Sequence, residues 1–300
     1  MDKATAPLLP LHIARALRAV DKATQGTEQH ARVLELADDL LYYLGALAIG
    51  QYSQAVVLEQ INADPALNRS LRSLRRVLPG QWLGWTAKGL EATPDGVVKG
   101  LREWYLQEST PELVTSYEAL RGVMVADLGY TGDFGERTFA PPRSLLELVD
   151  QYRIRRGKVP PETLPGNLDE RVAGALLPGL RAAISKASFL GEYVLYAPAQ
   201  RQLLMGVKAT TPMPPMSTPA DLADAASILL YPQSSVPDFT KRPSADEENR
   251  PLFPLDPLIV YIESKECDRF VMAALSGVEG GKPVYKGLDA ECKGEIKQGE

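Results

Sequence analysis

Three of the four arginines between residues 65 and 78 are spaced so that they lie along one side of a helix. Arg69, Arg72 and Arg76 are separated by three and four residues, while leucines take the opposite side. A row of guanidinium groups suits a phosphate or a carboxylate-bearing partner, because each group offers a planar set of donors. The alternative, which this pattern favours, is an ordinary solvated helix surface.

A second basic group ends the segment LLELVDQYRIRRGK (145–158). It consists of Arg153, Arg155, Arg156 and Lys158, and such a group could hold the phosphates of RNA. A glycine-rich run, SGVEGGKP (276–283), looks like a phosphate loop but has three residues between its glycines where the motif has four. Pro283 also stands where that motif needs Ser or Thr, so we predict a hairpin turn.

The other reactive side chains form no recognisable catalytic pattern. His12 and His30 are the only histidines, and we predict helix-surface or capping roles for them. Cys267 and Cys292 could share a bond or a metal if their strands were adjacent, but the sequence favours two partly buried thiols in a reducing cytosol. Asp38 and Asp39 are predicted to be the solvated polar edge of a helix. We therefore predict no catalytic residue, no metal and no cofactor.

Composition sets broad limits on function. The 300 residues are 45% hydrophobic and 24% charged, with a formal net charge of −5. These proportions are typical of a globular domain and argue against a generally basic nucleic-acid binder. The longest uncharged stretch, 40–58, is interrupted by glutamines and a serine, so it predicts a buried helix rather than a membrane span. We predict no membrane association and a cytoplasmic location.

The elements that would position these residues are mainly helical in the first half. The stretch 27–58 repeats apolar residues at steps of three and four on two neighbouring stripes, which is typical of a helix at the centre of a bundle. Further helices are predicted at 8–24, 65–78, 95–107, 110–128, 144–157 and 168–187. A short helix should bury Trp82 and Trp85, Ser144 should cap its helix, and Pro178 should kink or break the last one.

From Phe189 onward short β-type runs replace the helical pattern. We predict strands in 189–198, 200–210, 226–232, 255–264 and on both sides of Gly280–Gly281, and a frayed tail from Glu291. The predicted fold is α+β, with a helical bundle over 1–188 and a smaller antiparallel β-rich domain over 189–300. Residues 232–251 are predicted to form a mobile loop.

The segment 145–158 resembles the signature of HEPN domains, which are helical modules common in prokaryotic toxins and defence systems. In active members an Arg and a following His cleave RNA without a metal. Arg153 matches the Arg position, but Ile154 replaces the usual polar residue, and Lys158 stands near where the His belongs. No histidine follows His30, so the resemblance implies a degenerate member.

The wider pattern, with LVDQYR (148–153) in the helical part and PLDPLIVYIE (254–263) near the end, resembles bacterial proteins that accompany proteases, kinases or NTPases in defence or signalling operons. This resemblance implies a non-enzymatic regulatory or adaptor protein that binds such a protein partner. The alternatives are a HEPN-type ribonuclease or RNA-binding protein, and an unrelated hydrolase whose site forms only in three dimensions. The predicted binding surfaces are the two arginine groups and the 232–251 loop.

Overall fold

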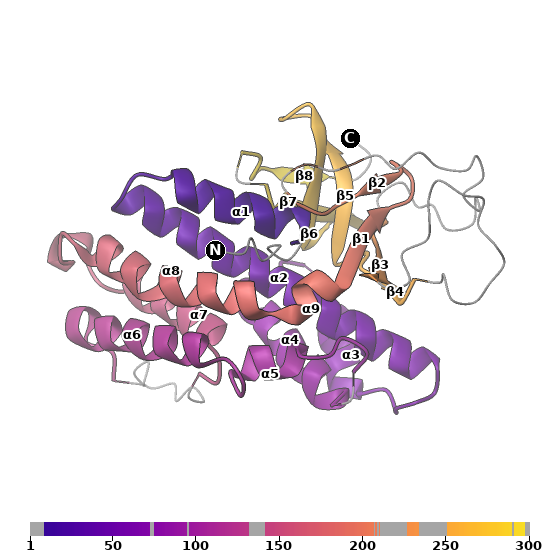
Figure 1. The fold of residues 1–300 in the computed structure, drawn as a ribbon, viewed down its shortest axis with the longest axis horizontal. Coiled ribbons are helices and arrows are strands. Elements are labelled where there is room, and N and C mark those ends of the chain that lie inside the picture. Colours follow the sequence, from indigo (N-terminus) through magenta and orange to yellow (C-terminus); the bar gives the residue numbers. More distant parts are fainter. Residues whose placement is uncertain are drawn as a thin grey trace, which may run out of the picture.

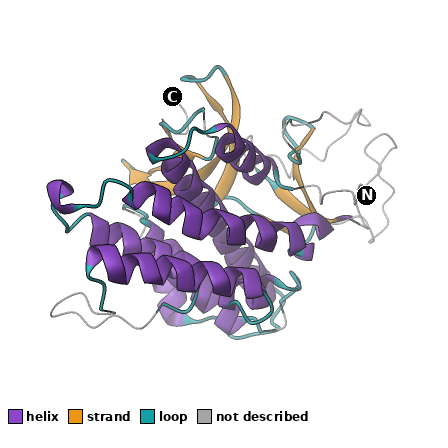
Figure 2. Cartoon of the chain, turned by 60° about the vertical axis from the view of Figure 1, so that its left-hand side comes forward, coloured by secondary structure: helices purple, strands orange, loops and turns teal. Residues whose placement is uncertain are grey.

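The structure is a computed structural model that describes residues 9–72, 75–94, 96–131, 142–206, 208, 210, 227–233, 251–289 and 291–297. Its helices lie in the first two thirds of the chain, and the strands of the last third form two antiparallel sheets. Figures 1 and 2 show the helices gathered in one part of the molecule and the strands in another. The predicted α+β class, with helices first, is therefore confirmed.

Helix α2 (Thr27–Val57) runs through the middle of the helical part (Figure 1). Every residue from Asp39 to Ile49 is buried, because other elements cover α2 on nearly every side. Helix α1 (Leu11–Lys22), α4 (Pro79–Ala92), α7 (Leu145–Arg156) and α8 (Leu168–Lys186) all pack against it. The charge-free run in the sequence thus correctly predicted a central helix.

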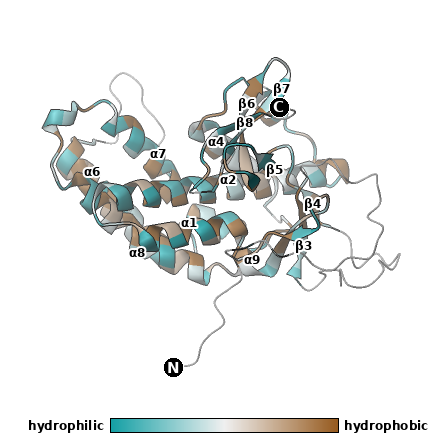
Figure 3. Cartoon of the chain, turned by 90° about the horizontal axis from the view of Figure 1, so that it is seen from above, coloured by the Kyte–Doolittle hydropathy of each residue, from teal (hydrophilic) through white to brown (hydrophobic). Residues whose placement is uncertain are grey.

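The remaining helices are shorter or lie further out. They are α3 (Pro65–Arg72), α5 (Leu101–Leu106), α6 (Pro111–Leu128) and α9 (Ser188–Glu192), with a 3₁₀ turn η1 (Pro161–Thr163). In Figure 3 hydrophilic and hydrophobic residues alternate around α6 and α8, as expected for helices with one face in solvent. Trp82 and Trp85 are buried on α4, and the Ser144 hydroxyl accepts a hydrogen bond from the Glu147 backbone N–H at 3.2 Å, so both predictions are confirmed.

Three helix predictions need correction. Helix α3 ends at Arg72 instead of continuing to residue 78. Helix α5 covers only six residues of the predicted 95–107, because Gly100 and Gln107 at its two ends adopt left-handed backbone conformations. Helix α8 continues through Pro178, so the predicted break is wrong, whereas the kink stays a prediction. The buried face of α8 against α6 compensates for the lost hydrogen bond, and Pro178 itself points to solvent.

Within the described ranges, the strands form two four-stranded sheets. The first has the order β2-β1-β3-β4, with β1 at Tyr193–Ala197, β2 at Gln202–Leu203, β3 at Leu229–Pro232 and β4 at Phe253–Pro254. The second is a meander of β5 (Ile259–Ser264), β6 (Arg269–Glu279), β7 (Lys282–Gly287) and β8 (Glu295–Lys297). Helix α9 takes the place of the first part of a predicted strand, and β8 lies in the tail that was predicted to fray.

The glycine-rich run is a hairpin turn, as predicted. Gly280 and Gly281 join β6 to β7 with φ angles of +56° and +81°, which only glycine adopts at little cost. Both conformations fit a two-residue hairpin, and a phosphate loop would instead open into a helix. The run therefore has a structural explanation.

A single hydrophobic cluster includes buried residues from the helices and from both sheets. Phe253 of β4 packs directly over Gly50 of α2, and the Val77 backbone N–H donates to the Ser276 carbonyl of β6 at 2.8 Å. The core thus continues across the predicted boundary at residue 188, and the division into 1–188 and 189–300 stays a prediction. Most of the predicted mobile loop, residues 234–250, lies outside the described residues.

Candidate functional sites: an arginine groove and a basic cleft

Contacts within the chain hold the three predicted arginines at the end of α7, Arg153, Arg155 and Arg156. Arg153 donates to the Asp38 carboxylate at 2.6 Å and to the Leu34 carbonyl at 2.9 Å. Arg156 donates to Asp169 at 2.9 Å. Arg155 instead turns toward the end of α6, where it donates to the Leu128 carbonyl at 2.8 Å. Arg153 and Arg156 therefore share one site, and Arg155 belongs to another face.

The fold places the imidazole of His30 beside this pair. His30 is buried on α2, so the predicted helix-surface or capping role is wrong. Its Nε2 lies 2.8 Å from the Tyr152 hydroxyl. Its Nδ1 lies 3.4 Å from the Asp169 carboxylate that also pairs with Arg156. Burial is the main reason that the pKa of His30 is lowered, and Arg156 and Arg153 lower it further against the opposing effect of Asp169.

A signal for this arrangement was present in the sequence. His30, Leu34 and Asp38 follow one another at steps of four, so they lie on one face of α2. That face packs beside the end of α7, where Arg153 contacts both Leu34 and Asp38. The pattern gave no indication that α7, more than a hundred residues later, would be the neighbour.

A groove of about 410 Å³ opens beside these residues. Arg153, Arg156 and Tyr152 form one part of its lining, and the apolar part comes mainly from Leu34, Val159, Pro161 and Leu164. We call it the arginine groove. His30 is not part of its lining, and Lys158 is exposed just beyond α7. The groove thus combines two guanidinium groups with an apolar surface of a size typical of binding sites.

The other predicted arginine row does not form a continuous stripe. Arg69 and Arg72 lie in the last turn of α3, where both are exposed. Arg76 lies beyond the end of that helix, and its backbone forms an isolated bridge with Gly277 of β6. The helix that should have aligned all three arginines ends too early because residues 76 and 77 pair with the sheet.

A second concave site was missed by sequence reasoning. It has a volume of about 440 Å³ and lies between α1, the start of α2 and the second sheet. We call it the basic cleft, because its lining includes six cations: Arg15, Arg18, Lys22, Arg32, Lys208 and Arg269. The α1 members are spaced by three and four residues, as a shared helix face requires, but the other three come from distant parts of the chain.

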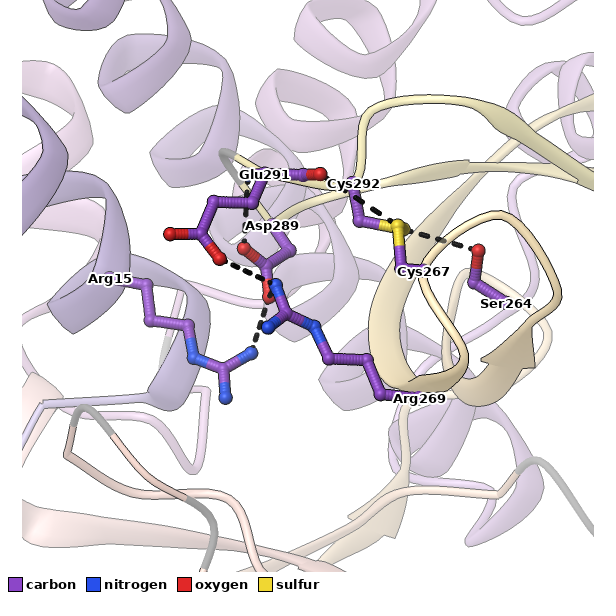
Figure 4. The surroundings of a disulfide bond; sticks show 7 residues. All are labelled: Arg15, Ser264, Cys267, Arg269, Asp289, Glu291 and Cys292. Atoms are coloured by element: carbon purple, nitrogen blue, oxygen red, sulfur yellow. Dashed lines mark hydrogen bonds and ion pairs between the residues drawn. A yellow bond between two sulfur atoms is a disulfide. The ribbon is translucent and has the colours of Figure 1, made fainter.

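A buried carboxylate organises one wall of the basic cleft (Figure 4). Asp289 is 5% exposed, and its Oδ2 accepts from Arg15 at 2.5 Å and from Arg269 at 3.0 Å. Glu291 accepts a further bond from Arg269 at 3.0 Å. Because one buried acid holds two guanidinium groups from different elements, their positions are fixed before any ligand arrives.

A disulfide lies next to this wall and corrects the prediction of two free thiols. Cys267 and Cys292 are bonded, with an S–S distance of 2.00 Å, and Figure 4 shows the bond beside Asp289 and Glu291. Cys267 sits in the turn between β5 and β6, while Cys292 sits between β7 and β8. The meander brings these two connections together, and their separation of 25 residues concealed that proximity.

Asp39 is also not the solvated residue that was predicted. It is 1% exposed, and burial raises its pKa to about 8, against the opposing effect of Lys293 at 3.8 Å. His12, predicted at a helix surface or cap, is buried beside it and packs on the Tyr43 ring. Burial, and then Lys293, lower the pKa of His12 to about 3. Both residues are uncharged parts of the core near neutral pH.

Comparisons with known proteins found no relative. A scan of protein-family models, a search of curated proteins and a search of solved structures each gave no match to this chain. None of the described helices has the length and apolar character needed to cross a membrane. Within the same described ranges, no group of three or more His, Cys, Asp or Glu residues could hold a metal ion.

Proposed function

We propose that this protein is a non-enzymatic regulatory or adaptor protein that binds a protein partner in a bacterial defence or signalling system. In this proposal the helical part is a degenerate HEPN-like bundle, and the partner is a protease, kinase or NTPase encoded nearby. The observation that carries the proposal is the arginine groove, in which two held guanidinium groups border an apolar surface.

The groove chemistry favours a short segment of protein as the ligand. Val159, Pro161 and Leu164 offer an apolar surface to a side chain. Arg153 and Arg156 offer donors to a carboxylate, since each guanidinium has five N–H groups and the internal contacts use only some of them. A peptide with an apolar residue beside an Asp or Glu combines these two features.

The placement of His30 argues against catalysis in the groove. A general base must reach the proton that it removes, and both His30 nitrogens already face Tyr152 and Asp169. Its side chain is 5% exposed, behind a fully buried Tyr152. The guanidinium groups likewise serve to hold α7 against α2 and the start of α8. Binding is therefore the simpler use of this site.

A co-expression experiment tests the proposed partner binding. The products of the neighbouring genes are each co-purified with the wild type, with Val159→Asp and with the matched control Val114→Asp, an exposed valine on α6. We expect one gene product to co-purify with the wild type and with the control. The same product should not co-purify with Val159→Asp. Equal retention by both folded variants, as judged by thermal unfolding, would place binding elsewhere.

The second candidate is a HEPN-type ribonuclease or RNA-binding protein, which the closeness of His30 to Arg153 and Arg156 favours. Incubation with total RNA at low salt separates the two proposals, since electrostatic binding is strongest there. If the protein is an adaptor, neither the wild type nor His30→Gln should cleave the RNA. Cleavage by the wild type that His30→Gln or Arg153→Ala abolishes would instead establish the nuclease.

The proposed location is the cytoplasm, and the disulfide provides a direct test. Disulfides persist mainly in oxidising compartments, so a reducing cytosol would favour the two free thiols unless burial protects the bond. Cys292 is 1% exposed, but Cys267 is only partly buried, so burial covers one of the two sulfur atoms that a reductant can attack. Rapid alkylation of intact cells measures the state of both cysteines, and fractionation of the same cells measures the location of the protein.

A further inference from the structure

The basic cleft has an excess of positive charge that the rest of the protein does not share. Of the described residues, its lining contains six cations and three carboxylates, Glu28, Asp289 and Glu291, which leaves three positive charges. The whole chain has a formal net charge of −5. A concave site of one sign on a molecule of the other sign focuses the electrostatic potential within it. The cleft is therefore a distinct positive site.

Five of the six cations of the cleft fall into two groups, and the sixth, Arg32, pairs with Glu35 of the same helix at 2.9 Å. Arg15 and Arg269 are held in place by Asp289, and Glu291 supports Arg269. By contrast, Arg18, Lys22 and Lys208 are exposed and form no ion pair with any residue that the structure describes. The first group supplies fixed geometry, and the second supplies charge that is still available to a ligand.

The remaining lining restricts the chemistry of that ligand. Among the residues that the structure describes, the lining of the cleft has no aromatic side chain on which a base could stack, and Ala19 is the only apolar residue in it. Recognition must therefore depend on charge and on guanidinium hydrogen bonds, which match phosphate oxygens well. A volume of about 440 Å³ suits a small molecule rather than a long chain.

We propose that the basic cleft binds a compact anion that carries several adjacent phosphate groups. Arg15 and Arg269 contact it with fixed donors, while Arg18, Lys22 and Lys208 neutralise its outer charges. This site is separate from the arginine groove and does not depend on the adaptor function. An inorganic phosphate chain and the phosphates of a nucleotide share this chemistry, and the experiment distinguishes these two sources.

Calorimetric titration of the full chain with tripolyphosphate, ATP, adenosine and citrate at low salt tests the site. We expect tripolyphosphate and ATP to bind, adenosine not to bind, and citrate to bind more weakly than either. Equal affinities for the two phosphate compounds indicate a phosphate chain as the natural ligand, and tighter binding of ATP indicates a nucleotide. Raising the ionic strength should weaken binding in either case.

Two charge-reversal variants link the binding to the cleft. Arg18 is exposed and unpaired in the described structure, so Arg18→Glu should leave the fold intact and weaken tripolyphosphate binding about tenfold or more. Arg121→Glu changes the net charge equally at an exposed position of α6, outside the cleft, and should leave the affinity within about twofold.

Three results would overturn the proposal. One is an absence of tripolyphosphate binding to the folded wild type at low salt. Another is an equal loss of affinity in Arg18→Glu and Arg121→Glu, which would show a response to net charge alone. The third is tighter binding of a single-stranded RNA than of tripolyphosphate, if Arg18→Glu abolishes the RNA binding. The cleft would then be part of a nucleic-acid-binding surface.

Discussion

Several charged residues in this protein fix its internal geometry. Asp289 holds Arg15 and Arg269, Asp38 holds Arg153, and Asp169 pairs with Arg156. Replacing one member of such a partly buried pair should destabilise the fold, because the other charge is left without a partner. Residue type alone therefore does not tell a binding arginine from a structural one.

The buried carboxyl group of Asp39 should make the free energy of unfolding depend on pH. Its pKa is raised from 3.8 to about 8 in the folded protein, so the folded state disfavours its charged form. The stability that depends on protonated Asp39 is complete below about pH 4 and is lost as the pH rises toward 8. We expect Asp39→Asn to be close to neutral at pH 4 and to stabilise the fold by about 2 kcal/mol or more at pH 8.

Chemical unfolding of the wild type and Asp39→Asn from pH 4 to pH 8 measures this difference. His12 has a lowered pKa, about 3, so its contribution is present above its ordinary pKa of 6.5 and is lost as the pH falls below it. Because His12 is retained in both proteins, its effect cancels in the comparison. A difference that does not grow with pH would show that Asp39 is charged in the folded state.

At the scale of elements, the close packing of α2 on α4 determines which substitutions the helices tolerate. Gly45 of α2 faces Trp82 and Thr86 of α4, and a Cβ atom at Gly45 would lie 2.6 Å from the Trp82 ring. Gly84, on the exposed side of α4, has no neighbouring atom within 4 Å of such a Cβ. An alanine side chain would therefore be crowded at position 45 and would have free space at position 84.

We expect Gly45→Ala to destabilise the protein by about 1–3 kcal/mol, because the added methyl group overpacks the contact between the helices. We expect Gly84→Ala to stabilise it by about 0.5–1 kcal/mol, because alanine loses less backbone entropy in a helix. Urea unfolding measures both changes, and Gly84→Ala is the matched control. Stabilisation by both substitutions would mean that α2 and α4 pack less closely than the structure shows.

One large hydrophobic cluster spans the helices and both sheets of the described structure, beside a small separate cluster of Tyr196, Leu229 and Tyr231. Helix α2 contacts strands β4 and β5, and the backbone of residues 76 and 77 pairs with β6. A helical part that unfolded separately would expose the surface that α2 shares with Phe253. The two predicted domains should thus depend on each other for stability.

This continuity predicts a single unfolding transition for the full chain. Far-UV circular dichroism follows the helices, and the fluorescence of Trp82, Trp85 and Trp104 follows the packing of α4 and α5. Both signals should give the same midpoint as amide-exchange mass spectrometry of β5 and β6. Separate midpoints for helices and strands would instead support independent domains with a boundary near residue 188.

The sequence by itself determined the local structure where short-range physics is decisive. The uncharged run in α2, the Ser144 cap and the paired glycines of the β6–β7 turn each specify a conformation within a few residues. Helix ends were less predictable, because α3 ends at Arg72 and the backbone of Arg76 already pairs with a distant strand. Local propensity contains no information about that strand.

Only the tertiary structure decided which side chains meet. His30 and Tyr152 are 122 residues apart, and Arg15 and Asp289 are 274 apart, so no local spacing could predict either contact. The sequence did identify Arg153 and Arg156, but it did not indicate their carboxylate partners or the groove beside them. Both candidate sites arise because packing of the apolar faces brings distant polar residues to one place, and periodicity specifies those faces without specifying their neighbours.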